Sequence, residues 1–144
     1  MLVQQILNSK PAAEVVTVKP GSTIAEAAAV LSGRRIGAVV ISADGKTVDG
    51  ILSERDIVRE LARSGSGCLI GLVDDLMTKH VVGCHTDDMA DDVLTKMTEG
   101  RFRHMPVVKD GEMVGLISIG DVVKARLSEL SMEKEALTGM IMGS

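Results

Sequence analysis

Short branched apolar runs and longer periodic stretches follow one another along this chain. Val15–Val18 is a β-branched run and Ile36–Ile41 is a continuous apolar one, so both predict strands, the second buried on both faces. Between them, Thr23 with Glu26 three residues later forms a capping box that opens an Ala-rich helix. We expect that helix to end at Gly33. The pattern therefore predicts the order strand, helix, strand.

The next stretch predicts a hairpin and a second helix. Asp44-Gly45 is a turn signal, and Val48–Leu52 is the expected returning strand. Ser53 then opens a helix whose apolar residues recur on one face. A Ser/Gly-rich segment at residues 63–67 predicts the helix end and a loop, before a short helical link.

This pattern occurs twice. Gly50–Val58 recurs as Gly115–Val123, an offset of about 65 residues, and Ile36–Ile41 recurs as Phe102–Val107. Asp110-Gly111 repeats the turn signal of the first copy. The chain is therefore an internal duplication with the order strand, helix, strand, strand, helix in each copy.

The second copy completes the predicted organisation. Asp88 is expected to cap a helix over Met89–Met97, and a last helix to run from near Gly120 through Leu130. Because a half of roughly 60 residues buries too little surface alone, we expect an α/β (α+β) fold in which two βαββα repeats pack sheet to sheet with pseudo-two-fold symmetry. The predicted parts are a lead-in helix at 1–14, a first repeat at 15–64, a linker with a short helix at 65–79, a second repeat at 80–130, and a helix end and tail at 131–144.

Composition excludes several classes of protein. The chain is 45% hydrophobic with nine Met and a single aromatic residue, so it is not disordered and lacks the rings on which nucleic-acid bases stack. A net charge of −4 gives no general attraction to nucleic acid or to anionic membranes. No apolar run approaches the roughly 20 residues of a bilayer span, and Met1–Lys10 lacks the pattern of a signal peptide. With two cysteines and no C-x-x-C pair, we expect a reduced, cytoplasmic protein with no nucleic-acid or membrane partner.

The duplicated motifs resemble a tandem CBS-domain pair, the cystathionine β-synthase type repeat that forms a stand-alone Bateman module. The resemblance rests on the Gly-hydrophobic-x-Ser-x-x-Asp segments Gly50–Asp56 and Gly115–Asp121, on the link Asp75–Thr78, and on the strands Ile36–Val40 and His104–Val108. It implies a flat module with pseudo-two-fold symmetry that binds adenosine nucleotides in clefts between the repeats and usually dimerises.

The Ser-x-x-Asp segments have two competing interpretations. A Ser at a strand-to-helix junction caps the helix, which is the structural interpretation. In the functional one, Asp56 and Asp121 accept hydrogen bonds from a ribose diol, while Ser53, Ser118 and the helix N-termini meet phosphate. The duplicated context favours the functional interpretation.

Other candidate binding residues flank these segments. The first strand of each copy and the small or apolar residues beside it offer a slot for adenine, and Arg55, Arg103 and His104 offer donors to phosphate. The two clefts differ, because Gly120 stands where the first copy has Arg55, and different ligands or affinities follow. The predicted nucleotide-binding set is Thr17, Val18, Ile36, Gly37, Ala38, Ser53, Arg55, Asp56, Gly83, Cys84, Arg103, His104, Met105, Pro106, Ser118 and Asp121.

Metal and catalytic sites are weaker hypotheses. His80, Cys84 and His85 fit no zinc template, and on a strand the last two point to opposite faces. A redox role for Cys84 stays open. No hydrolase, P-loop, dinucleotide or zinc-protease motif occurs, so we expect no enzyme, no catalytic residue and no metal requirement.

The chain is thus predicted to be a regulatory, energy-sensing module that binds AMP, ADP, ATP or NAD(H), with S-adenosylmethionine left open, and signals to an unidentified protein. The alternative is a ligand-free dimeric interaction scaffold. Either predicts a homodimer, because the helix faces offer more apolar surface than a small core needs, although the Met-rich end is alternatively a frayed tail. The surface residues in question are Ile57, Leu61, Val122, Val123, Leu127, Leu130, Met140 and Met142.

Overall fold

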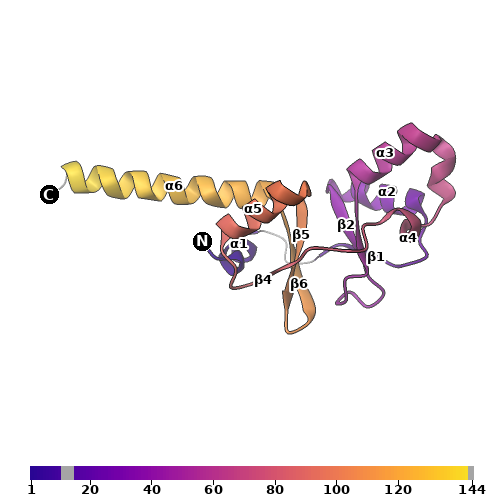
Figure 1. The fold of residues 1–144 in the computed structure, drawn as a ribbon, viewed down its shortest axis with the longest axis horizontal. Coiled ribbons are helices and arrows are strands. Elements are labelled where there is room, and N and C mark those ends of the chain that lie inside the picture. Colours follow the sequence, from indigo (N-terminus) through magenta and orange to yellow (C-terminus); the bar gives the residue numbers. More distant parts are fainter. Residues whose placement is uncertain (11–14, 143–144) are drawn as a thin grey trace. The chain divides into compact units, whose positions relative to one another are not determined.

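The computed structural model describes residues 1–10 and 15–142, which divide into two units (Figure 1). One unit, the first-repeat unit, contains Glu14–Val82 and Val108–Val114. The other, the second-repeat unit, contains Met1–Ala13, Gly83–Val107 and Gly115–Ser144. The strands form two three-stranded sheets, β1-β2-β3 and β4-β5-β6, so the expected mixed fold of two repeats is confirmed. The predicted repeat boundaries stay a prediction.

The first sheet is built around the apolar run. Its strands are β1 (Thr17–Val18), β2 (Ala38–Ile41) and β3 (Gly50–Ser53). The central strand β2 runs parallel to β1 and antiparallel to β3. All four residues of β2 are buried, as a continuous apolar run predicts.

Helices pack against this sheet from the same unit. They are α2 (Ile24–Arg34), α3 (Glu54–Ser64), the 3-10 helix η1 (Ser66–Ile70) and α4 (Val73–Leu76). The predicted loop after α3 is therefore partly helical. Aliphatic residues form the core, namely Val18, Ile24, Ala27, Leu31, Val39, Ile41, Leu52, Ile57 and Val73.

Gly33 does not end α2, which corrects the prediction. The helix continues for one more residue, and Arg35 adopts the left-handed conformation with φ 54° while its N–H donates to the carbonyl of Leu31. Arg101 does the same after α5, with φ 56°. The chain reversal that glycine usually supplies thus falls on an arginine in both repeats.

The first hairpin connection is longer than predicted. Asp44 accepts the backbone N–H groups of Thr47 at 2.7 Å and Lys46 at 2.8 Å, which closes a wide loop. These hydrogen bonds, the one from Thr47 foremost, hold the pKa of the Asp44 carboxyl well below its usual range. Strand β3 therefore begins at Gly50, and the prediction of a strand from Val48 is wrong.

The second-repeat unit has the matching order of elements. The hairpin of the second repeat closes with a two-residue turn in which Asp110 has φ 53° and Gly111 φ 81°, as the sequence predicts; the tip of this hairpin, Val108–Val114, is grouped with the first-repeat unit. Its core is Val3, Ile6, Cys84, Ala90, Val93, Met97, Met105, Val107, Ile117, Val122 and Ala125. The elements are α1 (Val3–Ser9), β4 (Cys84–His85), α5 (Ala90–Gly100), β5 (His104–Lys109), β6 (Glu112–Ser118) and α6 (Ile119–Met142).

The lead-in helix α1 is part of the second-repeat unit. Val3 and Ile6 lie in the core of that unit, and the N–H of Val3 donates to the carbonyl of Asp88 at 2.9 Å. The expected helix at 1–14 is thus present at Val3–Ser9, while residues 11–14 lie outside the described residues.

Asp88 does not cap α5. The N-cap residue is Met89, and the Asp88 carboxylate instead accepts the backbone N–H of His85 at 2.7 Å. Asp88 therefore closes the turn before the helix. The prediction was wrong because a short carboxylate satisfies a turn N–H as readily as a helix N–H.

Helix α6 is one continuous helix over Ile119–Met142 (Figure 1), so the segment expected to hold the helix end and a tail is helical as far as Met142. Near its start Val122 and Ala125 are buried, and Arg126 pairs with Asp91 of α5. From residue 131 to 142 every residue is exposed. Within the described residues, no helix combines the length and the apolar character that a bilayer crossing requires.

The apolar helix faces divide into two classes. Ile57 and Val122 are buried within their own units, so they belong to no free surface, contrary to the prediction. Leu127 and Leu130 are 62% and 49% exposed. The members of the predicted surface set that are exposed all lie on α6, namely Val123, Leu127, Leu130, Met140 and Met142.

Candidate ligand-binding sites

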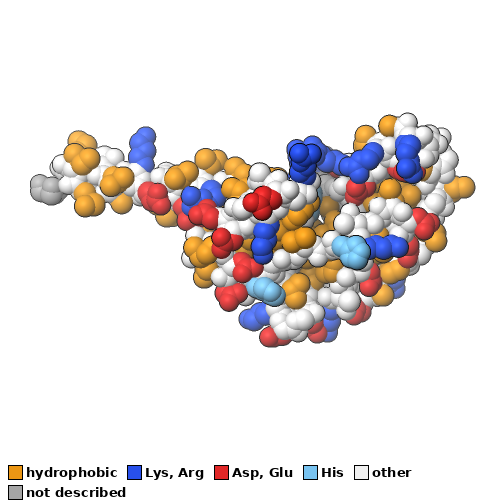
Figure 2. Space-filling model, in the orientation of Figure 1, with side chains coloured by type: hydrophobic (Ala, Val, Ile, Leu, Met, Phe, Trp, Pro, Cys, Tyr) orange, Lys and Arg blue, Asp and Glu red, His pale blue; other side chains and the backbone are white. Residues whose placement is uncertain are grey.

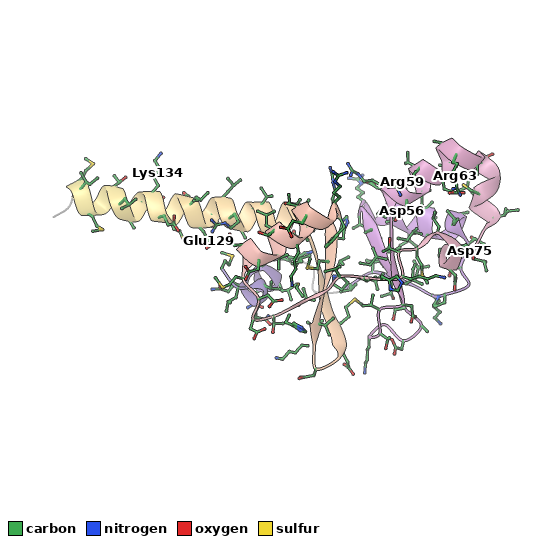
Figure 3. All side chains as sticks on the ribbon, in the orientation of Figure 1. Asp56, Arg59, Arg63, Asp75, Glu129 and Lys134 are labelled. Carbon is green, nitrogen blue, oxygen red and sulfur yellow. The ribbon has the colours of Figure 1, made fainter. Side chains whose placement is uncertain are left out.

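The first candidate site is the junction between β3 and α3, which we call the first junction and define by Ser53 and Asp56. The N–H and hydroxyl of Ser53 both donate to Oδ2 of Asp56, at 2.9 and 3.0 Å. In return the N–H of Asp56 donates to the Ser53 hydroxyl at 3.3 Å. Oδ1 of Asp56 lies 3.5 Å from an exposed nitrogen of Arg59 (Figure 3).

The sheet brings further predicted residues to the first junction. The N–H of Glu54 donates to the carbonyl of Gly37 at 2.9 Å, and Ala38 is paired with Ser53 across β2 and β3. Thr17 and Val18 lie on β1, the parallel neighbour of β2. Thr17 and Val18 pair with Val40 and Ile41, toward the other end of β2, so the sheet brings Gly37 and Ala38 to the first junction but not Thr17 and Val18.

The second candidate site is the junction between β6 and α6, defined by Ser118 and Asp121. The N–H of Ser118 donates to Oδ2 of Asp121 at 2.9 Å, and the N–H of Asp121 donates to the Ser118 hydroxyl at 3.1 Å. The N–H of Ile119 donates to the carbonyl of Arg103 at 2.8 Å, as Glu54 does to Gly37 in the first junction. The two junctions thus share three backbone N–H hydrogen bonds, and in the first junction the Ser53 hydroxyl donates to Asp56 as well.

The glycine of each motif is explained by close packing. A Cβ on Gly50 would lie 2.5 Å from the sulfur of Met77 and 3.0 Å from the carbonyl of Thr78. A Cβ on Gly115 would lie 2.6 Å from a methyl carbon of Leu7. Both glycines therefore allow another segment of their own unit to pass close to the strand that leads into the junction.

The charge environment separates the two junctions. Nζ of Lys10 donates to Oδ2 of Asp121 at 2.9 Å and to the carbonyl of Leu116 at 2.8 Å. Burial raises the pKa of Asp121, but the hydrogen bonds from Ser118 and the ammonium of Lys10 outweigh it, so the pKa lies below its usual value. In the first junction, the cation that pairs with Asp56 among the described residues is the exposed Arg59.

These two cations were absent from the sequence-based set. Arg59 lies one helical turn after Asp56, a spacing that would have revealed it. Lys10 is 111 residues from Asp121, and no local pattern links them. Arg55, which was predicted to face phosphate, is exposed in the first turn of α3, and Figure 2 shows basic side chains gathered over that helix.

Several predicted adenine contacts are buried in the unit cores. Val18, Ala38 and Met105 are 8%, 3% and 0% exposed, and Pro106 is buried as well. Their side chains are committed to packing, so only their backbone groups remain for an adenine edge. Ile36, Gly37, His104 and Ser118 are half-buried, while Gly83 and Arg103 are exposed.

Cys84 is a core thiol. It is 1% exposed, and burial, assisted by the nearby charge of Asp88, raises its pKa to about 12. A thiol with that pKa stays protonated at neutral pH and is a poor nucleophile. His85 is exposed on the opposite face of the strand. Within residues 1–10 and 15–142, no group of three or more His, Cys, Asp or Glu side chains could hold a metal ion.

An open groove of about 480 Å³ lies between α2 and α3 in the first-repeat unit. It touches Ile36 and Gly37 of the predicted set, but neither Ser53 nor Asp56 lines it. Its walls are Ala28, Leu31, Ser32, Arg35, Ile36, Gly37, Glu54, Ile57 and Val58.

Comparison with known sequences points to one family. A family model described as the CBS domain matches the chain twice, at residues 3–63 and 73–128. An uncharacterized 17.7 kDa protein from Acidianus ambivalens is 36% identical over 132 residues, which cover 91% of this chain and 76% of the relative. The CBS domain-containing protein CBSCBSPB2 of Arabidopsis thaliana is 32% identical over 127 residues, 88% of this chain and 23% of the relative. The chain thus spans about a quarter of the length of that plant protein.

Solved structures agree. The CBS-domain protein ATU1752 from Agrobacterium tumefaciens matches with a TM-score of 0.83 and 45% identity, covering 88% of this chain and 99% of that one. PAE2072 from Pyrobaculum aerophilum, complexed with AMP, matches with a TM-score of 0.78 and 29% identity over 92% and 99% of the two chains. The CBS pair of MJ0100, in complex with 5′-methylthioadenosine and S-adenosyl-L-methionine, matches with a TM-score of 0.76 and 28% identity over 90% and 98%.

Proposed function

The chain belongs to the CBS-domain family, and from that premise we propose that it is a regulatory module that binds adenosine ligands at its two junctions. The observation that carries the proposal is the choice of acid in the capping boxes. The box of α2, where only a cap is required, uses Thr23 with the longer Glu26, whose carboxylate lies 3.4 Å from the N–H of Thr23. Both junctions use Asp instead, at 2.9 Å from the serine N–H. The shorter acid holds a carboxylate close to the end of the strand in both repeats.

That carboxylate suits a ribose diol. An ionised carboxylate has about four acceptor positions, and the serine groups use one or two of them on Oδ2. Asp56 and Asp121 each keep acceptor capacity for a hydroxyl pair, as acidic residues do for ribose in dinucleotide folds. In this proposal the acid binds ribose, and backbone groups of the neighbouring strands bind the adenine edge.

Phosphate groups would meet the positive ends of the helices. The first N–H groups of α3 and α6 are weak anion sites, and Arg55, Arg103 and His104 add donors to them. Because Gly120 replaces Arg55 in the second repeat, we expect the first junction to prefer the more highly charged ligand.

The proposed ligands share the adenosine group. PAE2072 was solved with AMP. MJ0100 was solved with 5′-methylthioadenosine, a thioether, and with S-adenosyl-L-methionine, a sulfonium compound. We propose AMP, ADP, ATP or NAD(H) for this chain, with no metal required, and S-adenosylmethionine as the competing candidate. The proposed role is regulatory and energy-sensing, not catalytic, in a cytoplasmic homodimer.

Signalling follows from differential binding. A ligand shifts a conformational equilibrium by no more than the difference in its affinity for the two states. We propose that an adenosine ligand stabilises one state of the module and that a partner protein recognises that state. The longer plant relative is compatible with such a partner being a further domain of the same protein.

Isothermal titration calorimetry tests the proposal. AMP, ATP, NADH and S-adenosylmethionine are titrated into the protein and into Asp56→Asn and Asp121→Asn. The matched control is Asp92→Asn, because Asp92 is the third residue of α5, the position that Asp56 has in α3, and its N-cap Met89 makes no side-chain cap bond. We expect micromolar binding of one ligand, weakened at least tenfold at one site by each junction variant and unchanged in the control.

The opposite result is equally clear. If no adenosine ligand binds to folded protein, the ligand-free interaction scaffold replaces the sensor as the function. If binding persists unchanged in both junction variants, the ligand site lies elsewhere in the chain.

A further inference from the structure

Helix α6 carries an apolar seam that the family match does not include in full. Along this helix, residues that are apolar except for Lys134 recur with alternating steps of four and three residues. The match to the CBS family model ends at residue 128, before the end of this pattern. Such spacing over a heptad repeat is the signature of a coiled-coil contact. The seam consists of Val123, Leu127, Leu130, Lys134, Leu137 and Ile141.

The seam is exposed along its whole apolar length. Leu127 is 62%, Leu137 60% and Ile141 81% exposed, and Figure 2 shows hydrophobic side chains along the helix. At about 100° per residue, the centre of the seam lies about 130° around the helix from Val122 and Ala125, which face the core of the second-repeat unit. The helix therefore has one face for its own unit and a second face whose apolar side chains are exposed.

The outer half of α6 needs a partner to be a stable helix. Every residue from 131 to 142 is exposed, and an isolated helix of this length is marginal in water. Gly139 within the helix weakens it further. Burial of the seam is the contribution that offsets this cost.

From these observations we infer that α6 pairs in parallel with α6 of a second copy of this chain to form a two-stranded coiled coil. The inference deepens the proposed self-association, on which it rests, and does not depend on nucleotide binding. A closed two-fold dimer is the commonest assembly for one self-complementary surface.

Charge selects the second copy and its direction. Lys134 occupies the a position of a heptad whose d positions include Leu130 and Leu137, and its side chain points into solvent (Figure 3). In a parallel pair an a side chain packs beside the preceding g side chain of the other helix, so Lys134 meets the partner's Glu133. The two-fold axis gives two such ion pairs. In an antiparallel pair the g edges face each other, so a pair centred on this heptad would place Glu133 against the Glu133 of the second copy.

The oligomeric state of the full chain tests the inference. Sedimentation velocity is measured on the protein and on the double variant Leu137→Asp/Ile141→Asp. The control is Met132→Asp, because Met132 is 61% exposed on the side of the same helix opposite the seam. We expect a dimer for the protein and the control, and a monomer for the seam variant, with circular dichroism showing folded units in all three.

Charge exchange and cross-linking test the direction. Glu133→Lys and Lys134→Glu should each weaken the dimer several-fold, and the double variant Glu133→Lys/Lys134→Glu should restore it. In a Cys68→Ser background, Leu137→Cys should cross-link to itself under oxidation, because d positions meet in a parallel pair, whereas Met132→Cys should not.

Any other result of these experiments overturns the self-association, the coiled-coil interface or its parallel direction. A protein that is monomeric at all concentrations removes both the self-association and the coiled coil. A dimer that survives Leu137→Asp/Ile141→Asp keeps the self-association but places it on another surface. Absence of the Leu137→Cys cross-link in a seam-dependent dimer overturns the parallel direction.

Discussion

Nζ of Lys10 lies 2.9 Å from Oδ2 of Asp121, and the two side chains are 31% and 26% exposed. The equivalent Asp56 has only Arg59, at 3.5 Å and 76% exposed. A ribose diol that approaches Asp121 therefore meets a carboxylate that already has a cation, whereas Asp56 offers a more open acceptor. Two junctions of equal local geometry are thus expected to differ in affinity.

Removing that cation should strengthen binding at the second junction. In the Asp56→Asn background, which leaves only that junction, Lys10→Met is expected to raise the affinity for AMP about fivefold, because the acceptor no longer has to be released by Lys10, a difference of about 1 kcal/mol. Lys19→Met is the control, since Lys19 is exposed in the other unit. Calorimetry measures both. A loss of affinity in Lys10→Met would show that Lys10 binds the ligand itself.

The same ion pair predicts a pH dependence of stability. The folded-state pKa of Asp121 is lowered, so its contribution is present above the unfolded pKa of about 4 and is lost as pH falls through the folded pKa. At pH 7, Lys10→Met should lower the free energy of unfolding by about 0.5–1 kcal/mol, the range for a partly exposed pair. Urea titrations should show that this difference shrinks as pH falls through the folded-state pKa of Asp121. A difference that stays constant with pH would mean that Lys10 acts by packing alone.

The left-handed arginines predict a gain in stability. Arg35 has φ 54°, where a residue with a Cβ is strained by roughly 1 kcal/mol, so Arg35→Gly should raise the free energy of unfolding by about 0.5–1 kcal/mol. Arg34→Gly is the control, because Arg34 is still helical and glycine there should be destabilising. Thermal unfolding measures both shifts. If both variants are destabilised, contacts of the Arg35 side chain outweigh the backbone strain.

Gly50, the glycine of the first motif, predicts a loss of stability when it is replaced. Gly50→Ala should destabilise the protein by about 1–3 kcal/mol, because its Cβ would press on Met77 and on the carbonyl of Thr78. Gly33→Ala is the matched control, since no atom lies within 4 Å of its Cβ and its helical position should favour alanine by about 0.5–1 kcal/mol. In chemical denaturation, we expect the free energy of unfolding to fall in Gly50→Ala and to rise in Gly33→Ala. A neutral Gly50→Ala would show that Met77 moves aside without cost.

Local patterns predicted most elements, because their causes are local. The capping boxes at Thr23 and Ser53 and the buried run of β2 all involve residues within a few positions of each other. The two-residue turn at Asp110 also followed from adjacent residues. Predictions failed where a short carboxylate can accept a hydrogen bond from more than one nearby backbone N–H group, as Asp44 and Asp88 can.

Long-range contacts set the limits of the site prediction. Both Ser–Asp pairs were found because each lies within one helical turn. Lys10 was missed because its contact with Asp121 depends on where α1 packs in the tertiary structure. Likewise, the pattern placed Met105 near the second junction but did not reveal that its side chain fills the core.

The central claim is that the two aspartates recognise ribose, and the most direct test is to compare AMP with 2′,3′-dideoxy-AMP by calorimetry. The protein should prefer AMP by at least tenfold, since a site built to hydrogen-bond hydroxyls rejects a ligand without them. Asp56→Asn and Asp121→Asn should each remove that preference at one site. A preference for AMP that is undiminished in both variants, or equal binding of the two nucleotides to the unmodified protein, would contradict the account.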